Sequence, residues 1–116
     1  MLASDYQNAI AAFFRALGNE TRISILQILQ IDKELNVMEI SNRLKMQQYH
    51  ISRHLACLRN CGLVTARREG RVVFYSLNGH NRISQILSIA DTHVQTAFES
   101  ILACKVLNNN QTNIKS

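Results

Sequence analysis

The sequence predicts a mainly helical domain with a two-stranded β wing, in the order α-α-α-α-β-β-α. Apolar side chains recur at helical spacing within residues 47–62. Two runs rich in strand-forming residues follow, at 63–67 and 72–77, and the basic turn 68–71 separates them. The chain of 116 residues has the usual length of one domain. Together these features predict a winged helix-turn-helix.

Capping residues identify the first three helices. Ser4 begins a capping-box pattern, Ser-x-x-Gln, for a helix that ends at Gly18. Asn19 is placed to cap a second helix. Asn36, with Glu39 three residues later, marks the start of a third helix.

The fourth helix, which we call the reading helix, completes a helix-turn-helix. Residues 32–34 are a polar break before the third helix, and Lys45-Met46 connects the third helix to the fourth. Two short helices joined by so few residues, the second exposing polar groups, are typical of this motif. Gly62 directly follows the reading helix and suits its C-terminal end. The inward stripe of the reading helix consists of Ile51, Leu55 and Leu58.

A long last helix is expected from Asn81 to Val106. A helix of that length cannot bury its whole apolar stripe on so small a core, and Phe13 and Phe14 of the first helix also lack partners. We therefore expect a homodimer through the terminal helices, although both helices could instead cap the monomer core. Residues 1–107 would form the DNA-binding and dimerisation domain, and residues 108–116 a polar, flexible tail.

The positive charge is concentrated on the reading helix and the wing. The whole chain carries a net charge of +5. Residues 46–80 hold five arginines against one glutamate, which gives +4. Such a footprint indicates a double-stranded DNA partner, and a dimer would read a palindromic operator. The alternative is a solvated basic face.

Particular side chains are expected to contact DNA. On the reading helix they can donate to base edges in the major groove, and on the wing they can meet phosphates or the minor groove. His50 or Ser52 could instead serve the packing of the turn. The predicted contacts are Gln47, Gln48, His50, Ser52, Arg53, Arg67, Arg68 and Arg71.

Composition excludes several classes of protein. No run of about 18 uncharged apolar residues predicts a membrane span, and the N-terminus shows no signal-peptide pattern. Three cysteines are an odd number and do not indicate a disulfide framework. We therefore expect a cytoplasmic protein with reduced thiols. No glycine-rich phosphate loop or catalytic constellation appears, so we expect no enzymatic activity.

Cys57 and Cys61 stand four residues apart, on one face of the reading helix. Their Cβ atoms should lie about 5–6 Å apart, too far for an undistorted disulfide. Metal–sulfur bonds of about 2.3 Å or longer can span that gap. With Cys104 added, three thiolates favour a thiophilic effector ion, Cd(II) or Pb(II) first. As(III) is chemically feasible, and Zn(II) would want a fourth ligand, such as His54 or His93. Alternatively, the pair are small core residues.

The segment HISRHLACLRNCGLV and the wing EGRVVFYSL resemble the ArsR/SmtB repressors, over roughly residues 8–104. These are small winged-helix dimers that leave DNA when they bind metal. The pattern HLxCLRxCGLV with a third cysteine near the C-terminus is similar to the cadmium- and lead-sensing branch, which implies Cys57, Cys61 and Cys104 as ligands.

Two other metal sites of the family fit less well. The arsenic-type site needs cysteines near the third helix, where this chain reads ELNVMEIS. The zinc-type site of the last helix is matched only in part, by Asp91 and His93, because Cys104 and Leu107 stand at its later positions.

The resemblance implies a repressor that binds operator DNA as a dimer and is released by Cd(II) or Pb(II) at the Cys57/Cys61/Cys104 site. Two readings stay open beside it. One is a thiol-based redox or persulfide-sensing repressor of the same fold, and the other is a sensor of Zn(II) or As(III). Whether Cys104 acts within one protomer or across two also stays open.

Overall fold

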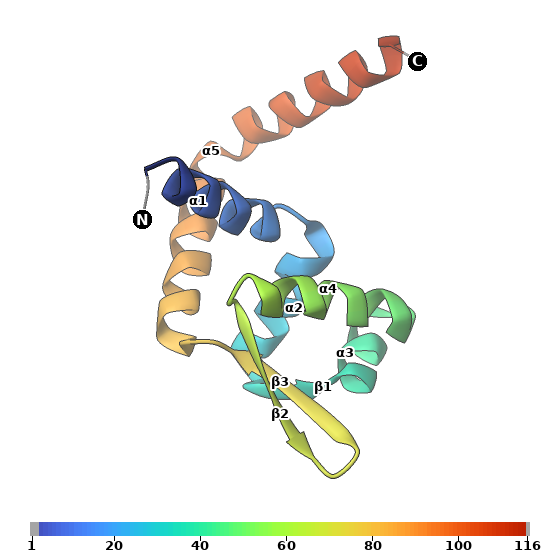
Figure 1. Ribbon diagram of the computed structural model, residues 1–116. Coiled ribbons are helices and arrows are strands. Elements are labelled where there is room, and N and C mark those ends of the chain that lie inside the picture. Colours follow the sequence, from blue (N-terminus) through green and yellow to red (C-terminus); the bar gives the residue numbers. More distant parts are fainter. Residues whose placement is uncertain (1–2, 116) are drawn as a thin grey trace. The chain divides into compact units, whose positions relative to one another are not determined.

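The computed structural model describes the backbone of residues 3–115 and the side chains as far as Cys104. It comprises two compact units, one up to Ile83 and one from Ser84 onward. The order of elements confirms the predicted fold class, a mainly helical winged helix-turn-helix (Figure 1). The elements are α1 (Ala3–Leu17), α2 (Glu20–Asp32), β1 (Glu34–Asn36), α3 (Val37–Leu44), α4 (Gln48–Asn60), β2 (Val64–Glu69), β3 (Val72–Leu77) and α5 (His80–Lys115).

The core of the first unit lies between α2 and α4. The predicted inward stripe of the reading helix α4 is confirmed, because Ile51, Leu55 and Leu58 are fully buried. Burial of each such side chain contributes about 1.5–3 kcal/mol. The residues that α2, α3 and the chain after α4 add to this core are Ile25, Leu26, Leu29, Ile40, Leu63 and Val64.

Two of the predicted helix caps are confirmed. The Asn19 side chain accepts a hydrogen bond from the backbone N–H of Arg22 at 3.1 Å. Asn36 and Glu39 form the predicted capping box, with reciprocal bonds of 2.8 and 3.0 Å. The box expected at Ser4 is wrong, because α1 already includes Ala3 and Ser4 lies inside the helix.

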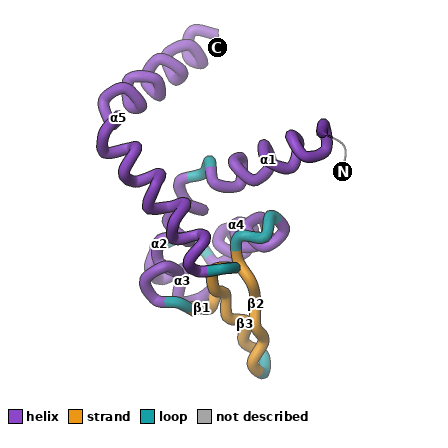
Figure 2. Tube along the Cα trace, turned by 90° about the vertical axis from the view of Figure 1, so that its left-hand side faces the viewer, coloured by secondary structure: helices purple, strands orange, loops and turns teal. Residues whose placement is uncertain are grey.

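The sheet has one strand more than the sequence predicted. β1 pairs antiparallel with β3, and the strand order is β1-β3-β2 (Figure 2). Glu34, expected in a polar break, is instead the first residue of this strand. The chain leaves α2 through Lys33 in a left-handed conformation, φ 71°. A strand of three residues with one buried side chain, Leu35, is too short to show an alternating pattern.

The wing is the hairpin of β2 and β3. Its register places Glu69 opposite Val72, so its loop is only Gly70-Arg71, shorter than the predicted turn. Gly70 has φ 63°, which suits the first position of a two-residue hairpin loop of type II′. Gly62 takes φ 75° after α4, as predicted for that end of the reading helix.

The last helix is longer and less regular than predicted. The sequence placed it at 81–106, whereas α5 runs from His80 to Lys115 and has non-helical backbone at Ala97 (φ −109°, ψ 20°). The backbone of the segment predicted as a tail is thus helical as far as Lys115; its flexibility and the boundary at 107 stay predictions. None of the described helices combines the length and the apolar character needed to cross a membrane.

Candidate nucleic-acid interface and thiol pair

The outer face of α4 presents the polar side chains that the sequence singled out. All five of these residues are exposed, while Ile51 between them is fully buried. Gln47 is the N-cap of α4 and its side chain makes no capping bond there. The arrangement leaves the side chains available to a groove of DNA. The five exposed residues are Gln47, Gln48, His50, Ser52 and Arg53.

Tyr49 belongs to the same face and was missed by the sequence reasoning. Its side chain is 62% exposed. Its hydroxyl accepts a 3.3 Å hydrogen bond from Arg53, whose guanidinium carbon lies 5.7 Å from the centre of the Tyr49 ring. The His50 ring packs edge-on against it, with centroids 5.3 Å apart. The sequence feature that could have identified Tyr49 is an aromatic residue on the polar side of a helix. In the structure, Tyr49 orients the Arg53 side chain.

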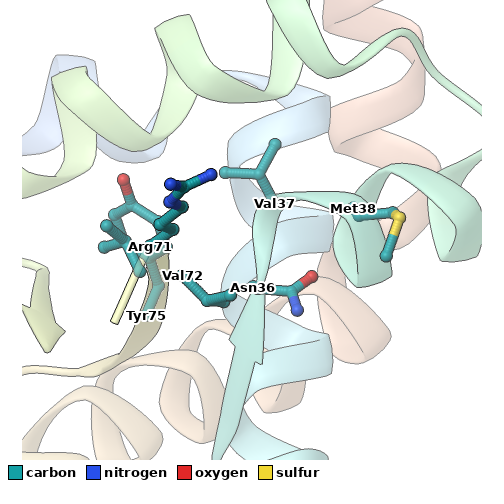
Figure 3. Close-up of a pocket in the computed structure, with 7 residues that line it drawn as sticks. Asn36, Val37, Met38, Arg71, Val72 and Tyr75 are labelled. Atoms are coloured by element: carbon teal, nitrogen blue, oxygen red, sulfur yellow. The ribbon is translucent and has the colours of Figure 1, made fainter. Parts of the chain in front are cut away.

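Arg68 and Arg71 of the wing are exposed. Neither forms an ion pair with any described residue. Arg71 also lines a shallow hollow of about 340 Å³ beside the start of α3, together with Val37 and Tyr75 (Figure 3). Both side chains are therefore accessible, and their contact with phosphate stays a prediction.

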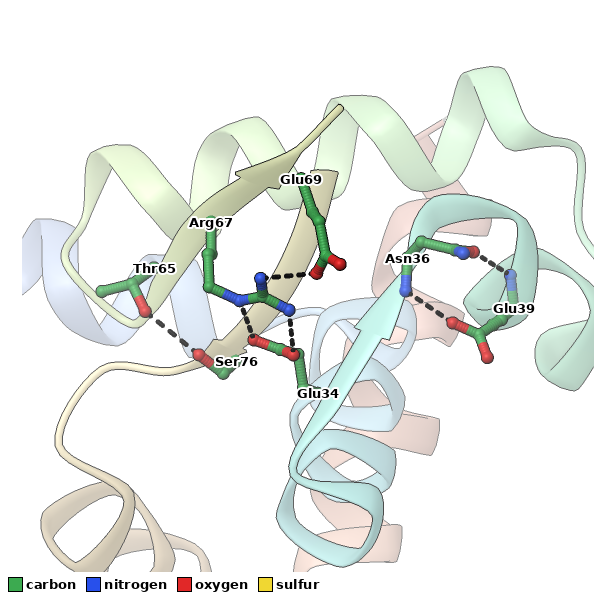
Figure 4. Close-up of polar contacts among 7 residues, drawn as sticks. All are labelled: Glu34, Asn36, Glu39, Thr65, Arg67, Glu69 and Ser76. Atoms are coloured by element: carbon green, nitrogen blue, oxygen red, sulfur yellow. Dashed lines mark hydrogen bonds and ion pairs between the residues drawn. The ribbon is translucent and has the colours of Figure 1, made fainter. Parts of the chain in front are cut away.

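Arg67 differs from the other wing arginines, because two carboxylates hold it (Figure 4). Its Nε and Nη2 donate to Glu34 at 3.0 and 2.7 Å, and Nη1 donates to Glu69 at 2.8 Å. The guanidinium carbon lies 5.0 Å from the Phe74 ring centre. Its hydrogen bond holds the pKa of Glu34 below its usual value. Arg67 thus ties β1, β2 and β3 together, and its contact with DNA stays a prediction.

Cys57 and Cys61 lie side by side at the end of α4, and both are half-buried. Cys61 is the C-cap residue, and its backbone N–H donates to the carbonyl of Cys57 at 3.1 Å. Burial raises the pKa of the Cys61 thiol; the charge of Cys57 and a hydrogen bond between the two side chains add to this effect. A metal ion that binds here must therefore displace protons.

Arg22, in the first turn of α2, links the end of α1 to the reading helix. Its Nε donates to the Ala16 carbonyl at 2.7 Å, and Nη2 donates to the Arg15 carbonyl at 3.1 Å. Its Nη1 lies 3.5 Å from Nδ1 of His54. Burial lowers the pKa of His54, and the positive charges of Arg22, His50 and Arg53 lower it further. The sequence offered His54 as a fourth ligand, but a cation stands directly beside its ring.

The described residues contain no cluster of three His, Cys, Asp or Glu side chains that could hold a metal ion. The pair Cys57–Cys61 supplies two adjacent thiol ligands from the first unit. Cys104, the third predicted ligand, is exposed on α5 and belongs to the second unit. The three-thiolate site therefore stays a prediction.

The partial zinc-type pattern on α5 is not assembled into a site. Asp91 accepts a hydrogen bond from Gln95 at 2.9 Å, one turn further along α5. His93 is exposed and stands two residues from Asp91, the spacing of the first two positions of that pattern. A site that uses both residues stays a prediction.

Comparison with known proteins identifies the class. The family model for "Bacterial regulatory protein, arsR family" matches residues 19–66. A cadmium resistance transcriptional regulatory protein, the CadC homolog of Staphylococcus aureus, is 33% identical over 92 residues, which cover 79% of this chain and 75% of that protein. The chain belongs to the arsR family of bacterial regulatory proteins.

Other relatives differ in what their names state. The transcriptional activator HlyU of Vibrio cholerae is 48% identical over 64 residues, or 55% of this chain. The regulator CmtR of Mycobacterium bovis is 41% identical over 71 residues, or 61% of this chain. The chain spans only 58% and 59% of the lengths of these two proteins.

A solved structure supports the fold. The homodimeric winged helix-turn-helix DNA-binding domain of a possible ArsR-family regulator from Mycobacterium bovis matches with a TM-score of 0.73 and 27% identity. The match covers 79% of this chain and 83% of that one.

Proposed function

We propose that this protein is a metal-responsive transcriptional repressor, which binds operator DNA as a homodimer and releases it when a thiophilic metal ion binds. The observation that carries the proposal is the Cys57–Cys61 pair on α4, the helix that also exposes the predicted base contacts. The family and the cadmium-resistance relative support the same class of function.

The ligands would be Cys57 and Cys61, with Cys104 as the third. Thiolates prefer soft ions, so Cd(II) or Pb(II) is the expected effector, with Zn(II) or As(III) as alternatives. Side chains four residues apart on a helix meet on one face. Because the Cys61 pKa is raised, metal affinity should increase with pH, as protons compete less for the thiolates.

The location of the pair indicates how binding reaches DNA. The two ligands lie in the last turn and at the C-cap of the reading helix. A third thiolate from α5 would tie this end of the helix to the dimerisation region. Release requires the metal to bind the DNA-incompetent form of the protein more tightly than the DNA-competent form. To shift the ratio of incompetent to competent protein from 1:99 to 99:1, the two binding free energies must differ by about 5.5 kcal/mol.

Exposed apolar side chains on the terminal helices support the homodimer. On α1 the rings of Tyr6 and Phe14 are 54% and 61% exposed. On α5, Ile89 and Phe98 are 70% and 56% exposed. Exposed apolar patches mark interaction sites, and a second copy of the chain fits the two-fold symmetry of operators.

The test is a titration of the reduced protein with Cd(II), followed by thiolate-to-metal absorption in the ultraviolet and by release of labelled operator DNA. Cys57→Ser, Cys61→Ser and Cys104→Ser are each compared with the wild type. We expect one metal ion per protomer, with weaker binding and weaker release in all three variants. Unchanged binding in Cys57→Ser and Cys61→Ser would show that the site is elsewhere.

A redox or persulfide-sensing repressor of the same fold is the second candidate. Cys57 and Cys61 are adjacent, half-buried thiols of the reading helix, and Cys57 lines a hollow together with Arg22 and Arg53. Mass spectrometry after mild oxidation separates the two functions. A new bridge between cysteines that accompanies DNA release, with no response to Cd(II), would favour this candidate.

A further inference from the structure

A hollow on the flank of α4 brings Arg22 of α2 beside residues that the sequence assigned to DNA or metal. Its volume is about 380 Å³, and it lies between the start of α2 and the middle of the reading helix. All of its lining side chains are polar or ionisable, and no carboxylate is among them. The lining residues are Arg22, His50, Arg53, His54 and Cys57.

We propose that this hollow binds a phosphate-type oxyanion. The ligand would be a phosphate of the DNA backbone or free inorganic phosphate, which share one chemistry. Two arginines would supply charge-assisted hydrogen bonds, and two imidazoles would supply further donors. The proposed ligand-holding residues are Arg22, Arg53, His50 and His54.

The first argument is uncompensated charge. The ion pairs among the described residues involve Arg43 and Arg67 but neither Arg22 nor Arg53. Two guanidinium groups therefore line one hollow without an acidic partner. Burial lowers the pKa of His54, and the positive charges of Arg22, His50 and Arg53 lower it further. An anion in the hollow would relieve this repulsion.

The second argument is preorganisation. The Arg22 guanidinium is fixed by the carbonyls of Arg15 and Ala16, at 3.1 and 2.7 Å. Arg53 is held by the hydroxyl of Tyr49 at 3.3 Å. A guanidinium group has five N–H donors, so both arginines keep donors for a ligand. Donors fixed in advance bind an anion with little loss of side-chain entropy.

Position favours a DNA phosphate as the source. His50 and Arg53 are exposed and are themselves predicted DNA contacts, so the hollow borders the reading face. Cys57 lines the hollow too. A ligand in the hollow would therefore lie beside the proposed metal site, although the oxyanion site does not depend on that site.

Two variants test the site, together with a matched control. Arg22→Gln removes one positive charge from the hollow. His54→Gln removes one imidazole but leaves the hydrogen bonds from Arg22 to the two carbonyls in place, so it tests the site even if Arg22→Gln does not fold. Arg59→Gln is the control, because Arg59 is exposed on the same helix and does not line the hollow.

The first arm uses inorganic phosphate, exchanged for chloride at constant ionic strength, without DNA or metal. Binding is followed through the imidazole NMR signals of His50 and His54, and through His50 alone in His54→Gln. We expect saturable shifts in the wild type and in Arg59→Gln, lost or strongly weakened in Arg22→Gln and His54→Gln.

The second arm measures DNA affinity against salt concentration. A backbone phosphate in the hollow predicts a slope of log affinity against log salt that is lower by about 0.9 in Arg22→Gln, with equal loss on operator and unrelated DNA. An unchanged slope with saturable phosphate shifts would assign the site to free phosphate. The proposal is overturned if phosphate gives no saturable shift and Arg22→Gln leaves the slope unchanged, or if Arg59→Gln behaves like the hollow variants in both arms.

Discussion

Arg68 and Arg71 give the most direct test of how the wing meets DNA. Both are exposed and form no ion pair in the described part of the chain, whereas Arg67 is held by Glu34 and Glu69. Each phosphate contact adds about 0.9 to the slope of log affinity against log salt. We therefore expect Arg68→Gln and Arg71→Gln each to lower that slope by about 0.9.

The size of the effect is measurable. Between about 50 and about 200 mM salt, the wild type should lose roughly 3.5-fold more affinity than either variant, because one phosphate contact contributes that factor to a fourfold change in salt. Fluorescence anisotropy with labelled operator and with an unrelated duplex of equal length measures both slopes. Because phosphate contacts carry no sequence information, the two duplexes should respond alike.

Arg67→Gln is the matched control on the same hairpin. It removes the same charge and a side chain of the same length. The Arg67 nitrogens already donate to the two carboxylates, so Arg67→Gln should lower the slope by less than half as much as Arg71→Gln does. An equal decrease of the slope in the two variants would refute the inference that the ion pairs weaken the contact of Arg67 with phosphate.

Three further results are expected. Leu55→Ala should lower the free energy of unfolding by about 2–5 kcal/mol in urea denaturation, because Leu55 is fully buried; a loss below about 1 kcal/mol would contradict the packing. Phe98→Asp should shift sedimentation toward the monomer and weaken operator binding, whereas an unchanged dimer would place the interface elsewhere. Glu34 has a lowered pKa in the folded state. Its contribution to folding stability is therefore fully present above the ordinary carboxyl pKa of about 4.5, and it is lost as the pH falls through the lower pKa of the folded state. In acid denaturation, Glu34→Gln should remove that part of the pH dependence, and an unchanged profile would contradict it.

Local signals in the sequence were sufficient for much of the fold. Asn19 and Asn36 act on backbone groups within three residues, so their capping roles are visible in the sequence itself. The buried stripe of α4 likewise follows from spacing along one helix. The order of the helices and the two wing strands could therefore be predicted without any knowledge of tertiary contacts.

Features that depend on distant residues could not be predicted in this way. β1 exists as a strand because Leu35 pairs with Tyr75 of β3. The ion pair of Arg67 depends on Glu34, which is 33 residues away in the chain. Arg22 reaches His54 across 32 residues, so the hollow had no signature in sequence spacing. The same limit applies to Cys104, which belongs to a different unit from Cys57 and Cys61.

Asn36 belongs to two elements at once, as the last residue of β1 and as the N-cap of α3. The strand that pairs with the wing is therefore continuous with the helix that packs on α4, and no loop separates them to act as a hinge. A force on the hairpin would be transmitted through this residue to the helices. The two parts of the predicted DNA-contacting surface, the wing and the reading helix, should consequently move as one rigid body. An effector would then change DNA affinity by rotating or shifting this body as a whole, without changing the angle between its two parts.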